Sequence, residues 1–538
     1  MKNCCQFFDK YIALLIISIL IVSLGVWNVR IPLGDEGIHA LQGISLAGNQ
    51  AFSMNLYYSI YALLFRTVTD DPIVAHIIIR FIVTIATTLG MYGVLTAFKS
   101  ISRPAILITC LIWASSTFAN PYAQIGNING FAFALVLPGL AMLLHYKNLN
   151  SLLLFMLGAF WAANVRPEYF ASLIMVSVCG ALLCIVMRKY RIPTTKNNIA
   201  VTIIISVLLA ASVWSSLAAK VDRGSLNEYL LQGLGQCYGV YYLKNNPSEV
   251  FDPMTEYQPI LDKVFGNPKN FFEAVSNNPS EAFKYLAING IQNTVRIIPA
   301  MTASNYIAKS IITKILVLLG TIAGIRAIYL RYKNHVARPA SNLPEKLNLL
   351  ILLAFATASS AAIILLIPDP RYWIACAPLV YLWFAWAIDN FFNIKRLERN
   401  KKYIFVGILL ALNIPHLLVG NPKKSSNQPM IYAIREAAKT LPEPVPQRPV
   451  IAGNFVSPVA SFAFRGEAVA VNTYNGLSVE DLKNHKYDIF VATELENTAL
   501  WNKELDFLNR FLADPEKFGY SRLKDSQGNL YDIYIRIR

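Results

Sequence analysis

Long apolar runs, separated by short polar segments, dominate the first 420 residues of the chain. A helix that crosses the bilayer core needs about 20 apolar residues, so we count about eleven of these runs as membrane-crossing helices. They are Tyr11–Val29, Pro72–Phe98, Ala105–Phe118, Gly130–Leu144, Ser151–Val165, Ala171–Met187, Ile199–Ala219, Ile311–Leu330, Leu347–Ile367, Trp373–Phe392 and Tyr403–Val419. The pattern predicts a mainly α fold, a polytopic transmembrane helical bundle.

The first run has basic residues before it, Lys2 and Lys10, as a signal peptide does. It is too long for the apolar core of a signal peptide, and no small-residue cleavage site follows before Arg30. We therefore expect a retained transmembrane helix with a cytoplasmic N-terminus.

Basic residues collect in every second loop between the runs. With the N-terminus inside, these inner loops carry Lys99, Arg103, Lys147, Arg188, Lys189, Arg191, Lys196, Arg331, Lys333, Arg338, Lys346, Lys395, Arg396, Arg399, Lys401 and Lys402. This is the positive-inside pattern. It places residues 31–71, 220–306 and everything after Val419 on the outer face.

Two domains follow from this arrangement. Residues 1–420 form the transmembrane domain, with outer loops 31–71 and 220–306, and residues 421–538 form a small α/β domain outside the membrane. In the first loop, His39–Phe65 is too short and polar to cross the membrane twice, so short helices along the membrane interface are expected.

The predicted outer C-terminal domain is polar and only locally apolar. Strands are expected at Val450–Asn454, "YDIFVAT" and "LYDIYIRIR", and helices at Met430–Thr440 and Asn502–Leu512. No Gly-rich phosphate loop follows any predicted strand.

Composition agrees with a membrane protein: 55% of residues are hydrophobic and 15% are charged, against roughly a quarter charged in soluble domains. The net charge of +16 is concentrated in the short loops, so it sets orientation and does not indicate a nucleic-acid partner. The seven cysteines are scattered, without metal-site or disulfide-framework spacing. No Asn-x-Ser/Thr site occurs outside Asn-Pro contexts, which favours a bacterial inner membrane.

An acidic pair, Asp35 and Glu36, stands between two glycines in "IPLGDEGIHAL" just after the first run. A carboxylate there could accept a proton from an attacking hydroxyl, and the glycines leave room for a ligand. The alternative is structural, because Asp and Glu are favoured in the first turn of a helix, and one is expected near Ile38.

Two arginine motifs stand at the predicted outer ends of later helices. Arg166 and Glu168 occur in "ANVRPEYF", and Arg371 and Tyr372 occur in "IPDPRYWIACAPL". A guanidinium at low dielectric suits phosphate binding. The alternatives are a local Arg166–Glu168 ion pair and an Arg371 that extends its head group to the membrane interface.

Arg80 follows His76 by one turn on a single apolar helix, so both are expected to face the bundle interior. The histidines, His39 among them, show no metal-ligand spacing. We assign no metal site.

Taken together, these motifs resemble the GT-C superfamily of membrane glycosyltransferases, in particular the protein O-mannosyltransferases and the aminoarabinose transferases to lipid A. The matching features are "GDEG" in the first outer loop, "VRPEY" at the outer end of a mid-chain helix, "DPRYWIACAPL" before a late helix, and an outer domain after the last helix.

The resemblance implies a polyprenyl-phosphate sugar as donor and a lipid, polysaccharide or protein as acceptor. Asp35 would be the general base in an inverting transfer, and Glu36 would orient the acceptor or support Asp35. Arg371 and Arg166 would bind the donor phosphate. Supporting roles fall to four residues: Glu168, Tyr372, Arg80 and His39. No cofactor is certain, because some relatives use a divalent metal and others do not.

Other classes of protein compete with this interpretation. A transporter would show related halves and broken helices, and neither is visible. A polysaccharide polymerase or ligase also uses a lipid-linked donor but would place key Arg and His residues in one large outer loop. Residues 220–306 contain Arg223 and Arg296 but no histidine.

Overall fold

The computed structural model describes most of the helical region and part of the C-terminal region. The described residues are 35–51, 53, 55–115, 127–166, 168–186, 196–218, 226–246, 257–302, 343–361, 374–391, 428–439, 441, 448–453, 463–464, 468–472, 480, 482, 484–492, 505–522 and 532–537. The predicted runs Tyr11–Val29, Ile311–Leu330 and Tyr403–Val419 lie outside these residues.

Each predicted apolar run that reaches the described residues forms a helix there. These helices are α4 (Pro72–Thr96), α5 (Arg103–Ser115), α6 (Asn127–Tyr146), α7 (Leu149–Val165), α8 (Tyr169–Val186), α9 (Lys196–Ala218), α15 (Leu343–Ala361) and α16 (Ala377–Phe391). The prediction of a mainly helical chain with a small C-terminal sheet is confirmed.

Two described helical segments, Pro72–Thr96 and Ile128–Tyr146, are long and apolar enough to cross a membrane. Four shorter apolar segments accompany them: Leu149–Val165, Tyr169–Leu182, Ile199–Ser215 and Ile374–Asn390. Length and composition alone are weak evidence for a crossing, so the count of about eleven stays a prediction.

The chain divides into two compact units. The larger unit comprises Met1–Val22 and Val83–Leu417, and the smaller unit comprises Ser23–Ile82 and Leu418–Arg538. The smaller unit therefore combines the first predicted outer loop with the C-terminal domain.

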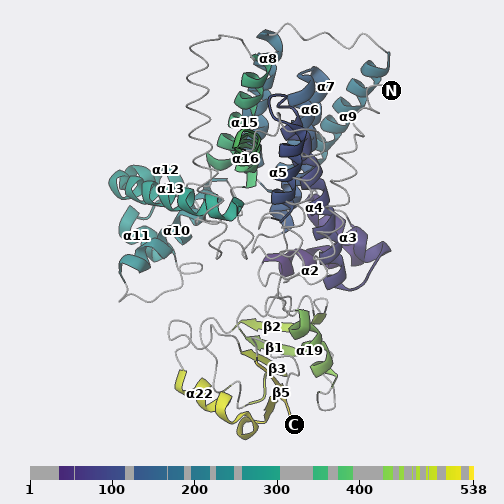
Figure 1. The fold of residues 1–538 in the computed structure, drawn as a ribbon. Coiled ribbons are helices and arrows are strands. Elements are labelled where there is room, and N and C mark those ends of the chain that lie inside the picture. The colour runs from purple at the N-terminus through teal and green to yellow at the C-terminus, as the bar shows by residue number, and fades with distance from the viewer. Residues whose placement is uncertain are drawn as a thin grey trace. The chain divides into compact units, whose positions relative to one another are not determined.

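In the larger unit, α5 to α9, α15 and α16 pack side by side (Figure 1). Two glycines let α6 and α7 approach each other closely. A Cβ at Gly139 would lie 2.6 Å from the Phe155 Cα, and one at Gly158 would lie 2.5 Å from the Leu135 carbonyl oxygen. Small residues at such positions let the backbones of membrane helices approach closely.

The α4–α5 connection is tied to two late helices. The Ser100 amide donates to Glu345 Oε1 of α15 (2.7 Å), and the Ser102 amide donates to Asp389 Oδ2 of α16 (3.0 Å). The Ser100 and Ser102 amides, in the connection just before α5, have no partner within that helix, and the two carboxylates accept their hydrogen bonds. The start of α15 and the end of α16 therefore lie at this connection.

Basic residues meet at this same end of the larger unit. His145, at the end of α6, contacts the Gly93 carbonyl of α4 (2.9 Å). Lys147, Lys99 and Arg103 all lie within electrostatic range of His145. We call this the basic end, and it brings together loops that the charge pattern assigned to one side of the membrane.

Four helices form the described part of residues 220–306: α10 (Leu226–Asn245), α11 (Gln258–Phe265), α12 (Phe271–Asn277) and α13 (Pro279–Thr302). Their shared core is rich in aromatic residues: Tyr238, Phe265, Phe271 and Tyr285. Asn278 caps α13 by accepting from the Glu281 amide (3.2 Å). Burial, together with a hydrogen bond to Glu281, raises the pKa of Tyr238.

The described part of the C-terminal domain contains a five-stranded sheet, in the order β2-β1-β3-β5-β4. Its strands are β1 (Val450–Gly453), β2 (Val469–Asn472), β3 (Ile489–Ala492), β4 (Tyr520–Arg522) and β5 (Asp532–Arg536). β1 is parallel to β2 and β3, whereas β5 is antiparallel to β3 and β4. Helices α19 (Gln428–Ala438) and α22 (Leu505–Ala513) accompany the sheet (Figure 1).

The three predicted strands and two predicted helices of this domain are confirmed within a few residues. Strands β2 and β4 were not predicted from sequence. The core residues that they help to cover include Phe490, Phe511, Tyr520 and Tyr534.

Candidate functional site

The acidic pair begins a helix. Asp35 and Glu36 are the first two residues of α2 (Asp35–Gly48), where acidic residues favour the positive end of the helix dipole. The helix thus starts three residues before Ile38, the start expected from sequence. Their side chains lie outside the described part of the chain. His39 follows Asp35 by one turn, so the two positions share a helix face.

His39 packs against the next helix, α3 (Leu56–Thr67). Its ring lies 5.6 Å from the Tyr57 ring in an edge-to-face arrangement and 5.5 Å from the Tyr58 ring. The expected short helices are present as α2 and α3, which pack on each other, and their place along the membrane interface stays a prediction.

Aromatic and basic residues continue from this contact into α4. Tyr57 packs edge-to-face on Tyr61 at 5.3 Å, and the Tyr61 hydroxyl lies 3.2 Å from His76 Nδ1. His76 is fully buried, and Arg80 is 5% exposed. The expectation that both face the interior is confirmed, and we call His39, Tyr57, Tyr61, His76 and Arg80 the first-loop cluster.

The cluster tyrosines were missed in the sequence. The signal was present, because Tyr57 and Tyr61 are one turn apart in "NLYYSIYALLF" and therefore share a helix face.

Arg166 and Glu168 form an ion pair at the connection between α7 and α8. Arg166 Nε donates to Glu168 Oε1 at 2.9 Å, and both side chains are mostly buried, 17% and 15% exposed. The next residue, Tyr169, is buried against Phe355 of α15. The local ion pair predicted as the alternative therefore exists, and it leaves the phosphate role untested.

Arg371 and Tyr372 lie outside the described residues. The chain resumes at Ile374, and Cys376 lies within electrostatic range of Tyr169. Ser172 of α8 donates to the Phe355 carbonyl at 3.0 Å. The start of α8, the end of α15 and the segment leading into α16 thus lie together, at the opposite end of these helices from the basic end.

The predicted three-part site is divided between the two units. Asp35 belongs to the smaller unit, and Arg166 belongs to the larger unit, together with Arg371. Their assembly around one substrate therefore stays a prediction.

Metal binding has no structural support in the described residues, which contain no group of three or more His, Cys, Asp or Glu side chains placed to hold an ion. Asp35 and Glu36 side chains are not among the residues on which this finding rests. The use of a divalent metal stays open.

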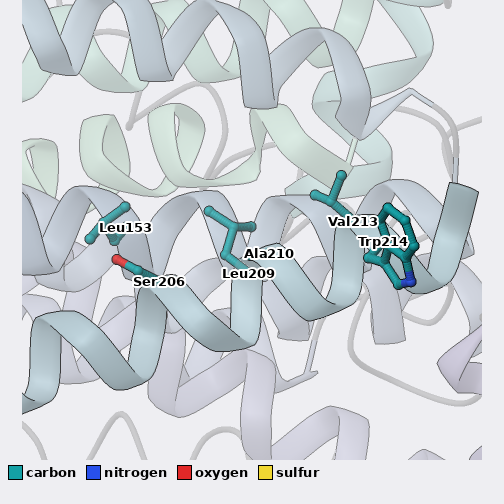
Figure 2. A pocket seen from close by; sticks show the side chains of 6 residues that line it. All are labelled: Leu153, Ser206, Leu209, Ala210, Val213 and Trp214. Atoms are coloured by element: carbon teal, nitrogen blue, oxygen red, sulfur yellow. The ribbon is translucent and has the colours of Figure 1, made fainter.

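A groove of about 360 Å³ runs between α7 and α9 in the larger unit (Figure 2). It is lined by Leu153, Ser206, Leu209, Ala210, Val213 and Trp214. Its lining has no ionisable side chain, so it does not supply a general base or a phosphate ligand.

No protein-family model and no curated protein matches the sequence. Among solved structures, this chain aligns with the crystal structure of an oligosaccharyltransferase from Archaeoglobus fulgidus in complex with Zn and sulfate. The TM-score is 0.43 at 12% sequence identity, covering 97% of this chain and 73% of that chain. A TM-score of this size does not establish a common fold, so function has to be argued from this chain's own residues.

Proposed function

We propose that the protein is a membrane glycosyltransferase. It transfers a sugar from a polyprenyl-phosphate donor to an acceptor on the outer face of the membrane, with inversion at the anomeric carbon. The proposal combines the three outer motifs of the sequence with the arrangement of the described helices.

Exposed apolar helix faces support the membrane setting. On α9, Ile204, Val207 and Trp214 are 58%, 59% and 74% exposed. Phe170 and Val178 of α8 are also more than half exposed. Soluble monomers rarely present large residues in such continuous apolar patches, whereas a lipid-facing helix does so along its length.

The observation that carries the proposal is that the basic loop residues and Arg166 lie at opposite ends of the larger unit. Lys99, Arg103 and Lys147 gather at the basic end. Arg166 lies at the other ends of the same helices, where the neighbouring Tyr169 is within electrostatic range of Cys376, just before α16. If the basic end is inside, Arg166 faces the outer leaflet, where a flipped lipid-phosphate sugar presents its head group, and we propose that Arg371 acts on the same side.

The two residues of the acidic pair act on the acceptor. Asp35 takes the proton from the acceptor hydroxyl, whose oxygen attacks the anomeric carbon while the bond from that carbon to the phosphate oxygen breaks. The products are the glycosylated acceptor and the free polyprenyl phosphate. Glu36 orients the acceptor or supports Asp35.

Charge on the departing phosphate is balanced by the arginines. Arg371 and Arg166 provide fixed donors for the phosphate oxygens. Glu168 holds Arg166 through the 2.9 Å contact, and Tyr372 stands beside Arg371 in the sequence. In the first-loop cluster, His39 and Arg80 support the segment that carries Asp35.

We place the protein in a bacterial inner membrane, with its active site on the periplasmic side. The acceptor is a lipid, a polysaccharide or a protein, and each is compatible with the described residues.

The test supplies the full-length protein in nanodiscs with a panel of polyprenyl-phosphate hexoses and pentoses, and with membrane extract as the acceptor source. Mass spectrometry measures release of polyprenyl phosphate. We expect release from at least one of these donors and none from nucleotide sugars. Turnover confined to a polyprenyl-diphosphate oligosaccharide would instead support a polymerase or ligase, and turnover of no donor would reject the proposal.

A further inference from the structure

Within the smaller unit, a bidentate ion pair joins the C-terminal domain to the end of the first outer loop. Arg435 Nη1 donates to Asp71 Oδ2 at 2.9 Å, and Arg435 Nη2 donates to Asp71 Oδ1 at 3.0 Å. The two side chains are 23% and 25% exposed. Such paired contacts between a guanidinium and a carboxylate fix orientation as well as distance.

Two further contacts of Arg435 hold it within the C-terminal domain. Its Nε donates to the Ala463 carbonyl at 3.1 Å, and its guanidinium lies 5.3 Å from the centre of the Tyr432 ring. Each of these contacts restricts the side chain to the conformer that reaches Asp71. A lysine could not reproduce this set, because it carries a single ammonium group.

Asp71 in turn fixes the start of α4. Its Oδ1 accepts from the Ile73 amide at 2.8 Å, and its carbonyl accepts from the Ala75 amide at 3.0 Å. Burial alone would raise the pKa of Asp71, but hydrogen bonds from Arg435 and from Ile73 outweigh it, so the pKa lies below its ordinary value. The carboxylate is therefore charged, as both contacts require.

Contacts within the smaller unit lead from Asp71 towards the acidic pair. His76 is in the second turn of α4, and its Nδ1 contacts the Tyr61 hydroxyl of α3 at 3.2 Å. Tyr61 packs so closely on α2 that a Cβ at Gly43 would lie 2.3 Å from the Tyr61 Cβ. Asp35 begins that same helix.

We propose that Arg435 is a positioning residue for the reaction. Through Asp71 it docks the C-terminal domain on the start of α4 and so holds α2, with its acidic pair, in the arrangement that transfer needs. This role for the C-terminal domain rests on the proposed function.

The test compares kcat and KM for Arg435→Gln, Arg435→Lys, Asp71→Asn and the Gln/Asn double variant of the full-length protein. Asn is as good a helix cap as Asp, so Asp71→Asn removes the charge and keeps the cap. We expect Arg435→Gln and Asp71→Asn each to lower kcat about tenfold, with an unchanged donor KM. Arg435→Lys recovers only part of the rate, and the double variant is no slower than either single variant.

Lys439→Gln is the matched control. Lys439 is one turn further along the chain from Arg435, just beyond α19, and it pairs with Glu436 in an exposed contact. We expect its kcat to equal that of the wild type. Equal kcat values for Arg435→Gln and Lys439→Gln would overturn the proposal, as would additive losses in the double variant.

Hydrogen exchange separates this inference from the proposed function. We expect faster amide exchange over residues 56–77 in Arg435→Gln and Asp71→Asn, but not in Lys439→Gln. Unchanged exchange there would contradict the docking role, whether or not the wild type transfers sugar. If the two variants exchange faster but the wild-type protein turns over no lipid-phosphate sugar, the proposed function alone is rejected and the docking contact is established.

Discussion

At the residue scale, substitutions that change one charge at a time can distinguish the role of Arg166 from that of Glu168. Glu168→Gln keeps an oxygen that can accept from Arg166 Nε and removes the negative charge, whereas Arg166→Ala removes the guanidinium. If Arg166 binds the donor phosphate, Arg166→Ala raises the donor KM about tenfold and Glu168→Gln does not raise it. Steady-state kinetics with varied donor checks this. A rise of equal size in both variants would assign the pair to structure only.

Residue roles were only partly predictable from the sequence. The burial of His76 and Arg80 followed from their place on an apolar helix, where a charged group has to face protein. The partner of Asp71 could not be inferred, because Arg435 is 364 positions away and nothing in the local pattern around either residue indicates the other. Contacts at such separation depend on how helices and sheet pack.

At the element scale, the contact between α2 and α3 depends on one glycine. Gly43 has no room for a Cβ beside Tyr61, whereas a Cβ at Gly48, on the same helix, would meet nothing within 4 Å. We expect Gly43→Ala to cost about 1 to 3 kcal/mol through overpacking and to reduce transfer. We expect Gly48→Ala to be within about 0.5 kcal/mol of the wild type. Thermal unfolding in detergent and the transfer assay measure both, and equal unfolding temperatures would contradict this account of the helix contact.

Helices were easier to predict than strands, for a physical reason. A long apolar run such as Pro72–Phe98 exceeds the length of any ordinary strand, so its type is unambiguous. Strand β2 has four residues and β4 has three, whereas the predicted strands β3 and β5 lie within the longer runs "YDIFVAT" and "LYDIYIRIR". The segments of β2 and β4 become strands because β1 and β5 offer edges for pairing.

At the scale of the whole molecule, the basic end makes a prediction about sidedness. Lys99 and Lys269 are both exposed, one at the basic end and the other between α11 and α12. In a cysteine-free background, Lys99→Cys is expected to react with a membrane-impermeant maleimide only in inverted vesicles, and Lys269→Cys only in intact spheroplasts. Labelling of both from the same side would contradict the orientation.

The overall organisation was predicted in its order along the chain but not in its division into units. Charge in the short loops predicted which loops share a side, and the contacts of His145 bring three of those basic residues together. The grouping of Ser23–Ile82 with the C-terminal domain was not anticipated, because it depends on contacts such as that between Asp71 and Arg435.

The central claim is that Asp35 is the general base of a lipid-phosphate sugar transfer. Its most direct test is polyprenyl-phosphate release by full-length Asp35→Asn, with Asp262→Asn, an exposed acidic position on α11, as the control. We predict that Asp35→Asn lowers turnover by about 100- to 10,000-fold without loss of folded protein, and that Asp262→Asn retains wild-type turnover. Wild-type turnover by Asp35→Asn would contradict the account.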